Sequence, residues 1–95
     1  MSETQTYQVE HNLSASRFEV RLENHLAVLD YRKMDDTILF THTGVPSALE
    51  GRGIGSALVR TGLDYARQQS LKVASMCSFV DAFIRRKPEY QDLLK

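Results

Sequence analysis

The sequence predicts one small domain of mixed α/β class: three antiparallel strands, a long helix, a parallel fourth strand and a C-terminal helix. Apolar residues alternate strictly with polar ones over residues 17–23, and two further strand-like segments follow at residues 26–32 and 37–43. From residue 54 the apolar spacing changes to a helical period. A chain of 95 residues can bury one modest core and is too short for two.

The strands are expected at residues 17–23, 26–32 and 37–43, joined by turns at Asn24-His25 and Asp35-Asp36. In the first strand, Phe18, Val20 and Leu22 share one face. The third strand is rich in β-branched and aromatic residues, which favour strands. Because the turns are short, we expect an antiparallel meander.

A helix is expected from residue 54 to about residue 69. Its apolar stripe consists of Ile54, Ala57, Leu58, Thr61, Gly62, Tyr65 and Ala66. Residues 71–76 predict a fourth strand, and short links around a helix favour a right-handed parallel crossover. We expect the third and fourth strands to be parallel and to diverge near Val45 and Cys77. A second helix from Phe79 must end before Pro88, and residues 89–95 form a last helical turn.

Residues 1–12 are polar and aperiodic, so we expect a flexible N-terminal tail there and the domain over residues 13–95. Twelve basic and twelve acidic residues give zero net charge, so no nucleic-acid partner is expected. No apolar run approaches the roughly 20 residues of a spanning helix, so no membrane partner is expected. A single cysteine and the lack of a signal peptide favour the cytoplasm.

Three glycines at alternate positions, Gly51, Gly53 and Gly55, stand where a strand passes into a helix. Glycine permits positive φ and close ligand approach, and helix N-terminal amides favour an anion. A pyrophosphate can dock at such a loop. A Walker A ending is absent, and a dinucleotide fingerprint fails because Ser56 takes the place of its third glycine. A glycine-rich helix start without a ligand is the alternative interpretation.

Val45-Pro46 followed by residues 51–58 resembles the acetyl-CoA loop of GNAT acetyltransferases, Arg/Gln-x-x-Gly-x-Gly/Ala. A longer set of motifs resembles the small GNAT-like subfamily of YjdJ type, over about residues 18–94. That set is His42-Thr43, Val45-Pro46, residues 51–58, Cys77-Ser78-Phe79 and Pro88-Glu89-Tyr90. The resemblance implies a minimal GNAT-like fold with acetyl-CoA as co-substrate.

The resemblance also implies which residues hold the cofactor. The pantetheine arm should lie along Thr43, Gly44 and Val45. The pyrophosphate should meet the loop Glu50, Gly51, Arg52, Gly53, Ile54, Gly55 and Ser56, with further contacts from Ser78, Phe79, Phe83 and Arg86. Glu50 departs from the family's Arg or Gln. We expect its carboxylate to turn away and Arg52 to supply positive charge.

Two residues are candidates for the chemistry. Cys77 ends the fourth strand beside helix amides that can lower its pKa, so it is a candidate nucleophile or proton donor, with a buried structural thiol as the alternative. His42 shares strand parity with Ile38 and Phe40 and is a candidate general base, with a purely structural histidine as the alternative. The family's tyrosine acid is missing, because Arg86 takes its position when Ala82 matches the family's alanine. The three histidines have no metal-ligand spacing, so no metal is expected.

We therefore predict an acetyl-CoA-dependent N-acetyltransferase. The sequence does not identify the acceptor amine or the oligomeric state. We expect an open acceptor side, which suits a peptide, a protein amine or a polyamine. A CoA-binding or acyl-CoA-sensing module without turnover is the main alternative, favoured by Glu50 and the missing tyrosine. A small adaptor that recruits partners through its sheet edge is the third.

Overall fold

A five-stranded sheet with two helices on one face forms the molecule. The computed structural model describes residues 7–94. Strands follow one another in the sheet in the order of the chain, antiparallel from β1 to β4, with β5 parallel to β4. The strands are β1 (Glu10–Asn12), β2 (Arg17–Leu22), β3 (His25–Met34), β4 (Thr37–Gly44) and β5 (Lys72–Ser75). The helices are α1 (Ile54–Gln68) and α2 (Ser78–Arg86), with 3-10 turns at Ser47–Leu49 and Pro88–Leu93.

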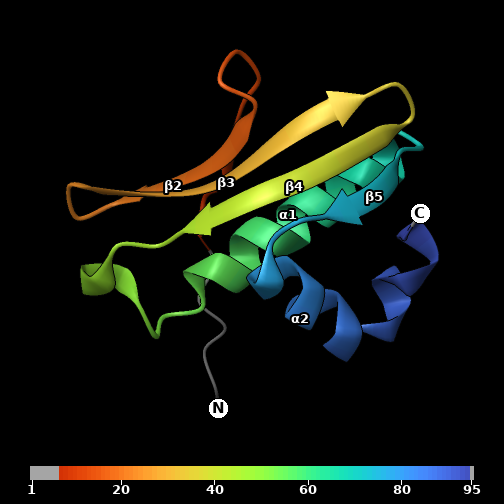
Figure 1. Ribbon diagram of the computed structural model, residues 1–95. Coiled ribbons are helices and arrows are strands. Elements are labelled where there is room, and N and C mark those ends of the chain that lie inside the picture. The colour runs from red at the N-terminus through yellow and green to blue at the C-terminus, as the bar shows by residue number, and fades with distance from the viewer. Residues whose placement is uncertain (1–6, 95) are drawn as a thin grey trace.

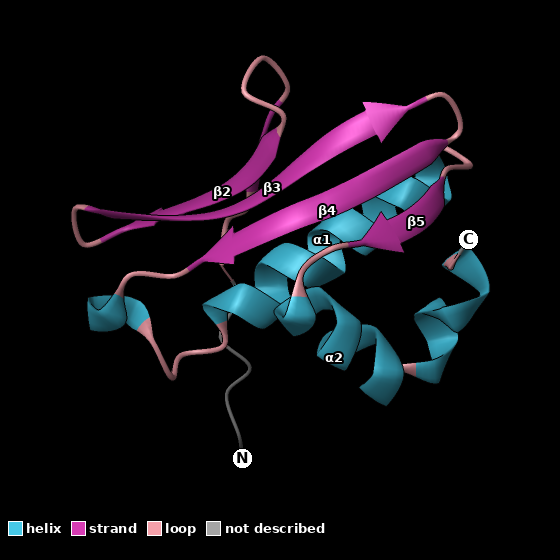
Figure 2. Cartoon of the chain, viewed as in Figure 1, coloured by secondary structure: helices cyan, strands magenta, loops and turns pink. Residues whose placement is uncertain are grey.

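Both helices cover the same side of the sheet, and the other side carries no helix within residues 7–94 (Figures 1 and 2). α1 packs on β2 and β3, and α2 packs on β4 and β5. The predicted mixed fold, with three antiparallel strands, a long helix and a parallel strand, is confirmed. None of the helices in this described part is long and apolar enough to span a membrane.

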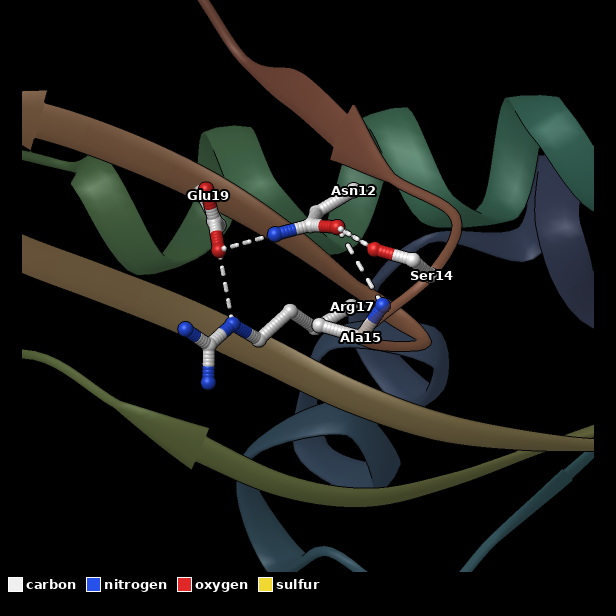
Figure 3. A network of polar contacts seen from close by, with 5 residues as sticks. All are labelled: Asn12, Ser14, Ala15, Arg17 and Glu19. Carbon is white, nitrogen blue, oxygen red and sulfur yellow. Dashed lines mark hydrogen bonds and ion pairs between the residues drawn. The ribbon is translucent and has the colours of Figure 1, made fainter.

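The strand β1 was not predicted. Residues 10–12 pair with β2, so the tail expected over residues 1–12 is wrong for this segment, and residues 1–6 lie outside the described residues. The ring of His11 stacks on Phe18 at 4.1 Å between centroids. Asn12 donates to the Glu19 carboxylate (3.0 Å), which also accepts from Arg17 (2.7 Å; Figure 3). These contacts with β2 stabilise a strand that has no apolar pattern of its own.

The turn between β2 and β3 consists of Glu23 and Asn24, one residue earlier than predicted. Both have positive φ, 53° and 64°. Two central residues with positive φ make a type I′ turn, whose twist matches that of the flanking strands. His25 is therefore the first residue of β3.

The core lies between the sheet and the two helices. Alternate residues of β2 and β3 point into it, including Phe18, Val20, Ala27 and Leu29. α1 approaches the sheet closely at Gly62, where a Cβ atom would lie 3.0 Å from the Phe40 ring. The buried side of α1 is rotated relative to the predicted stripe. Gly55, Val59 and Leu63 are buried, whereas Ala57, Thr61 and Tyr65 are half-buried.

Candidate functional site

A β-bulge in β4 creates the framework of the site. Tyr31 of β3 pairs with Phe40, but the preceding residue, Asp30, pairs with His42, so Thr41 is an extra residue. A bulge bends its strand and increases the local twist. The parallel pairing of β4 with β5 ends at the same point, at Phe40 and Ser75. The last parallel pair on β4, at Phe40, lies five residues before the predicted point of divergence near Val45.

The bulge also reverses the side on which His42 lies. Thr43 pairs with the fully buried Leu29 and shares the helix-covered face with Phe40. His42 is exposed, and its Nε2 lies 3.1 Å from the place of a Cβ on Gly44, which pairs with Val28. The expectation that His42 shares a face with Ile38 and Phe40 is therefore wrong, because strict alternation does not hold across a bulge.

Ser75 ends β5. Its hydroxyl accepts a hydrogen bond from the Cys77 amide (3.1 Å) and donates to the Cys77 carbonyl (3.0 Å). A short hydroxyl side chain that binds nearby backbone groups competes with the ladder. The amide of Met76 still donates to Phe40 (2.9 Å), and α2 begins at Ser78. The chain therefore leaves the sheet where β4 bends.

A cleft of about 390 Å³ opens between the end of β4 and the first turns of both helices. Its lining consists of Thr43, Val45, Leu49, Glu50, Gly51, Gly53, Ile54, Gly55, Ser56 and Phe79. Nine of these ten belong to the predicted cofactor-binding set, and Leu49 is the addition. Leu49 is fully buried in a 3-10 turn, and its apolar side chain gave no signal that distinguishes it from core residues.

The glycine loop adopts the conformation that glycine permits. Gly51 and Gly53 have φ of +82° and +80°, and a Cβ on either would meet no atom within 4 Å. Gly53 is the N-cap of α1, and the first helical hydrogen bond runs from Ala57 to its carbonyl. The amides of Ile54, Gly55 and Ser56 precede that bond, so no helical carbonyl accepts from them. Such amides, together with the helix dipole, favour an anion at this end of the cleft.

The absence of a side chain at Gly55 lets the ring of Phe79 form one side of the cleft. A Cβ there would lie 2.9 Å from Cζ of Phe79, so the ring packs directly on the backbone of α1. Phe79 is still 39% exposed, because its remaining surface lines the cleft. The third glycine of the motif therefore serves close packing, whereas the first two serve positive φ.

The charges near the cleft differ from the expected arrangement. Glu50 is the one charged residue in the lining among the described residues. Arg52 lies outside it, and its guanidinium binds Glu23 at 2.8 and 3.3 Å. This contact, followed by the charge of Arg52, lowers the pKa of Glu23. The positive charge expected from Arg52 is held by a carboxylate on the β2–β3 turn.

Cys77 adjoins the cleft through Thr43. Its sulfur lies 3.3 Å from Oγ1 of Thr43, which lines the cleft. Burial alone would raise the pKa of Cys77, but Thr43 and the backbone amides of Val80 and Phe79 outweigh it and lower the pKa. Cys77 is half-buried, with a thiolate favoured relative to an ordinary cysteine.

A family model described as GCN5-related N-acetyl-transferase matches residues 17–93. The chain belongs to this family. Protein NATD1 of Gallus gallus is 34% identical over 84 residues, which cover 85% of this chain and 76% of that protein. Protein NATD1 of Homo sapiens is 34% identical over 83 residues, which cover 84% of this chain and 74% of that protein. The solution structure of a GCN5-like protein from Staphylococcus aureus has a TM-score of 0.74 and 28% identity, and the match covers 97% of this chain and 91% of that one.

Acetyl-CoA is the co-substrate of this GCN5-related family, so the cleft can be compared with the residues expected to hold it. Gly44 lies on the far face beside Val28. Phe83 is buried in the core, with Arg60 over its ring at 5.6 Å, and Ser78 and Arg86 are exposed on α2 outside the cleft lining. The loop residues that the motif implies, apart from Arg52, line the cleft together with Phe79. Farther along α2 the helical rotation carries side chains away from the cleft. Over residues 7–94, no three His, Cys, Asp or Glu side chains group as a metal site would require.

Proposed function

We propose that this chain transfers an acetyl group from acetyl-CoA to an amine. One observation carries the proposal: the cleft joins the uncapped amides of α1 to the point where β4 and β5 part. Membership in the GCN5-related family supports the reaction type.

The start of α1 fits a pyrophosphate by its backbone. The amides of Ile54, Gly55 and Ser56 supply donors, and the missing side chains of Gly51 and Gly53 leave open space in front of them. The Glu50 carboxylate opposes an anion, and no cation in the described lining offsets it. We therefore propose that the amides provide most of the phosphate affinity and that CoA binding is weak for the family.

The second half of β4 fits an extended, amide-bearing arm. Beyond Phe40 it has lost β5 as a neighbour, and Thr43 and Val45 line the cleft there. An extended ligand can add to such a strand edge through main-chain hydrogen bonds. The pantetheine arm of CoA, which carries two amides, has the chemistry for this position.

We propose that Cys77 lies at the acetyl end of the cleft. The bound thioester supplies the acetyl group, and the neutral amine attacks its carbonyl carbon. Cys77 can act there as a nucleophile, as a proton donor to the leaving sulfur, or as part of the wall. His42 is the second catalytic candidate, as a general base on the uncovered face of the sheet, where its exposed ring can exchange protons with water.

The acceptor that we propose is a peptide, a protein amine or a polyamine, and the proposed subtype within the family is the YjdJ type. A cytoplasmic location is the accompanying prediction. The alternative is a CoA-binding module without turnover, which Glu50 in the lining favours. Continuous release of free CoA in the presence of an amine distinguishes the enzyme from the module. Acetyl-CoA binding without such release would favour the module.

The pyrophosphate site is tested best at Ser56, the third residue of α1. A carboxylate in Ser56→Asp stabilises the helix by about 0.3–1 kcal/mol. The same charge repels a pyrophosphate, so CoA affinity measured by calorimetry should fall by about tenfold or more. Gly53→Val is a poorer test, because φ of +80° strains a branched residue.

Ser56→Asn is the matched control, since it has the size of the aspartate without its charge. It should retain CoA affinity within about threefold, as expected of a substitution that alters no charge. Equal affinity of the Asp and Asn variants in folded protein would contradict the pyrophosphate assignment.

The role of Cys77 is tested by mass spectrometry after incubation with acetyl-CoA alone. A nucleophile forms a bond from its sulfur to the acetyl carbon while CoA leaves as the thiol, so one acetyl group should be found on Cys77 and the kinetics should be ping-pong. If Cys77 only lines the cleft, the Cys77→Ala variant should keep most of its turnover. The Cys77→Trp variant should lose CoA binding, because the larger side chain fills the cleft. Full CoA binding by folded Cys77→Trp protein would contradict the proposal that Cys77 lies at the cleft.

A further inference from the structure

We propose that Tyr7 and Glu23 are positioning residues of the glycine loop and that both act through Arg52. The inference rests on the proposed function, because it assigns to these residues the preorganisation of the proposed pyrophosphate site. It gives Arg52 a structural role in place of the phosphate contact expected from the sequence.

Two distant parts of the chain meet at Arg52. The hydroxyl of Tyr7, 45 residues earlier in the chain, donates to the Arg52 carbonyl at 2.7 Å. The guanidinium donates to both oxygens of Glu23, 29 residues earlier, and at 3.4 Å to the carbonyl of Ala48. One residue of the loop is thus held by its backbone and by its side chain.

The position of Arg52 explains why the loop needs these contacts. It lies between Gly51 and Gly53, both with positive φ. Glycine has the largest conformational freedom to lose on ordering, so two glycines in three residues make an isolated loop mobile. Contacts to the residue between them restrict both sides of the loop at once.

The Tyr7 contact also sets the direction of an amide in the site. A trans peptide is planar, and its N–H points opposite to its carbonyl. When Tyr7 binds the Arg52 carbonyl, the amide of Gly53 must point away from Tyr7. Gly53 lines the cleft, whereas Tyr7 and Arg52 do not. We infer that the hydrogen bond from Tyr7 to the Arg52 carbonyl orients the Gly53 amide as a donor on the cleft side of the loop.

A different role for Glu23 makes the opposite prediction. If Arg52 bound the phosphate and its ion pair with Glu23 competed with that contact, removal of the Glu23 charge would free Arg52 and strengthen CoA binding. If Glu23 braces the loop, the same change weakens binding. The sign of the effect separates the two roles.

The first experiment compares Tyr7→Phe with Tyr90→Phe in the full chain. Each variant loses one tyrosine hydroxyl that donates a hydrogen bond; that of Tyr90 binds Asp64 at 2.8 Å, away from the cleft lining. NMR order parameters are measured in the free protein. In Tyr7→Phe, the order parameters of the Gly51, Arg52 and Gly53 amides should fall from about 0.85 toward 0.6. In Tyr90→Phe the same order parameters should not change. The CoA dissociation constant should rise about fivefold in Tyr7→Phe alone.

Unchanged loop order in Tyr7→Phe, or an equal loss in both variants, overturns the role of Tyr7. The second experiment measures CoA affinity in Glu23→Gln, which should weaken about twofold because the ion pair is exposed. Tighter or unchanged binding overturns the role of Glu23. If the parent protein binds no CoA, the proposed function fails, while the order parameters of the free protein still decide whether Tyr7 braces the loop.

Discussion

The two halves of β4 differ in sequence and in role: the first is mostly apolar, and the second is polar. The first half, Thr37 to Phe40, pairs on both sides, and Ile38 and Phe40 are fully buried. The second half, Thr41 to Gly44, pairs on one side only and contains no fully buried residue. One extra residue, Thr41, separates the two halves.

This difference shows how a small domain can place a site on a core strand. Pairing on both sides satisfies the backbone and leaves the strand no free edge. The bulge bends the strand, and Ser75 takes over the backbone groups of Cys77, so the neighbouring strand ends. The free edge then lies beside the start of α1, where uncapped amides meet the cleft. Stability and function are thus divided along one strand.

The largest expected effect is in the first half. Phe40→Ala should lower the free energy of unfolding by about 3–5 kcal/mol, because the ring fills the core against Gly62. His42→Ala, two residues later, should change it by less than about 0.5 kcal/mol, because that ring is exposed. Urea denaturation of both variants is the measurement. Similar losses would mean that alternation continues through Thr41 and that the two halves are not distinct.

Deletion of Thr41 is expected to have a smaller effect on stability and a larger one on binding. The pairs of Phe40 with Tyr31 and of His42 with Asp30 can both persist without it, so the loss should be about 1–2 kcal/mol. A strand without the bulge is straighter, and its second half would stay closer to β5. CoA affinity should therefore fall more than about tenfold by calorimetry, since each 1.4 kcal/mol is tenfold.

Thr41→Ala is the control for this deletion, because it keeps the extra residue and removes only side-chain atoms. It should bind CoA as the parent does. Parent-like affinity in the deletion variant would show that the bulge does not hold the cleft open.

The sequence predicted the parts of the fold that depend on local chemistry. Alternation predicted β2, strand-forming residues between short turns predicted β3 and β4, and the helical period predicted α1. The glycines indicated the loop, because positive φ at Gly51 and Gly53 is a property of those residues themselves. The pairing of β4 with β5 followed from the short links around α1 and the handedness of crossovers.

What the sequence did not predict depends on contacts between distant residues. The strand β1 is polar, and besides its contacts with β2 it is held by His11, whose Nε2 lies 2.6 Å from the hydroxyl of Tyr31, 20 residues later. The bulge lies in Thr41-His42-Thr43, where every residue is polar and alternation gives no signal of a change. Arg52 was expected at the phosphate, but Glu23 reaches it from a turn 29 residues earlier. No local pattern contains these pairings.

The smallest expected effect concerns the second half of β4 and its contact with Cys77. The thiolate accepts a hydrogen bond from Thr43, which lowers the pKa of Cys77 against the opposing effect of burial. A lowered pKa means that the thiolate is already populated at a pH where an ordinary cysteine is protonated. The rate of alkylation by iodoacetamide should therefore reach half its maximum at a lower pH than for a free cysteine. Cys77 is the single cysteine of the chain, so the rate reports on it alone.

Thr43→Val keeps the shape of the side chain and removes its hydroxyl, so the pKa of Cys77 should rise and the alkylation profile should move to higher pH. Thr41→Val makes the same chemical change on the bulge residue, which does not contact the sulfur through its hydroxyl in the described contacts. It should leave the profile in place. An unmoved profile in Thr43→Val would show that the Thr43 hydroxyl does not lower the pKa of Cys77. In that case the second half of β4 would line the cleft without lowering the pKa of Cys77, and the nucleophile version of the Cys77 proposal would depend on the amides of Phe79 and Val80.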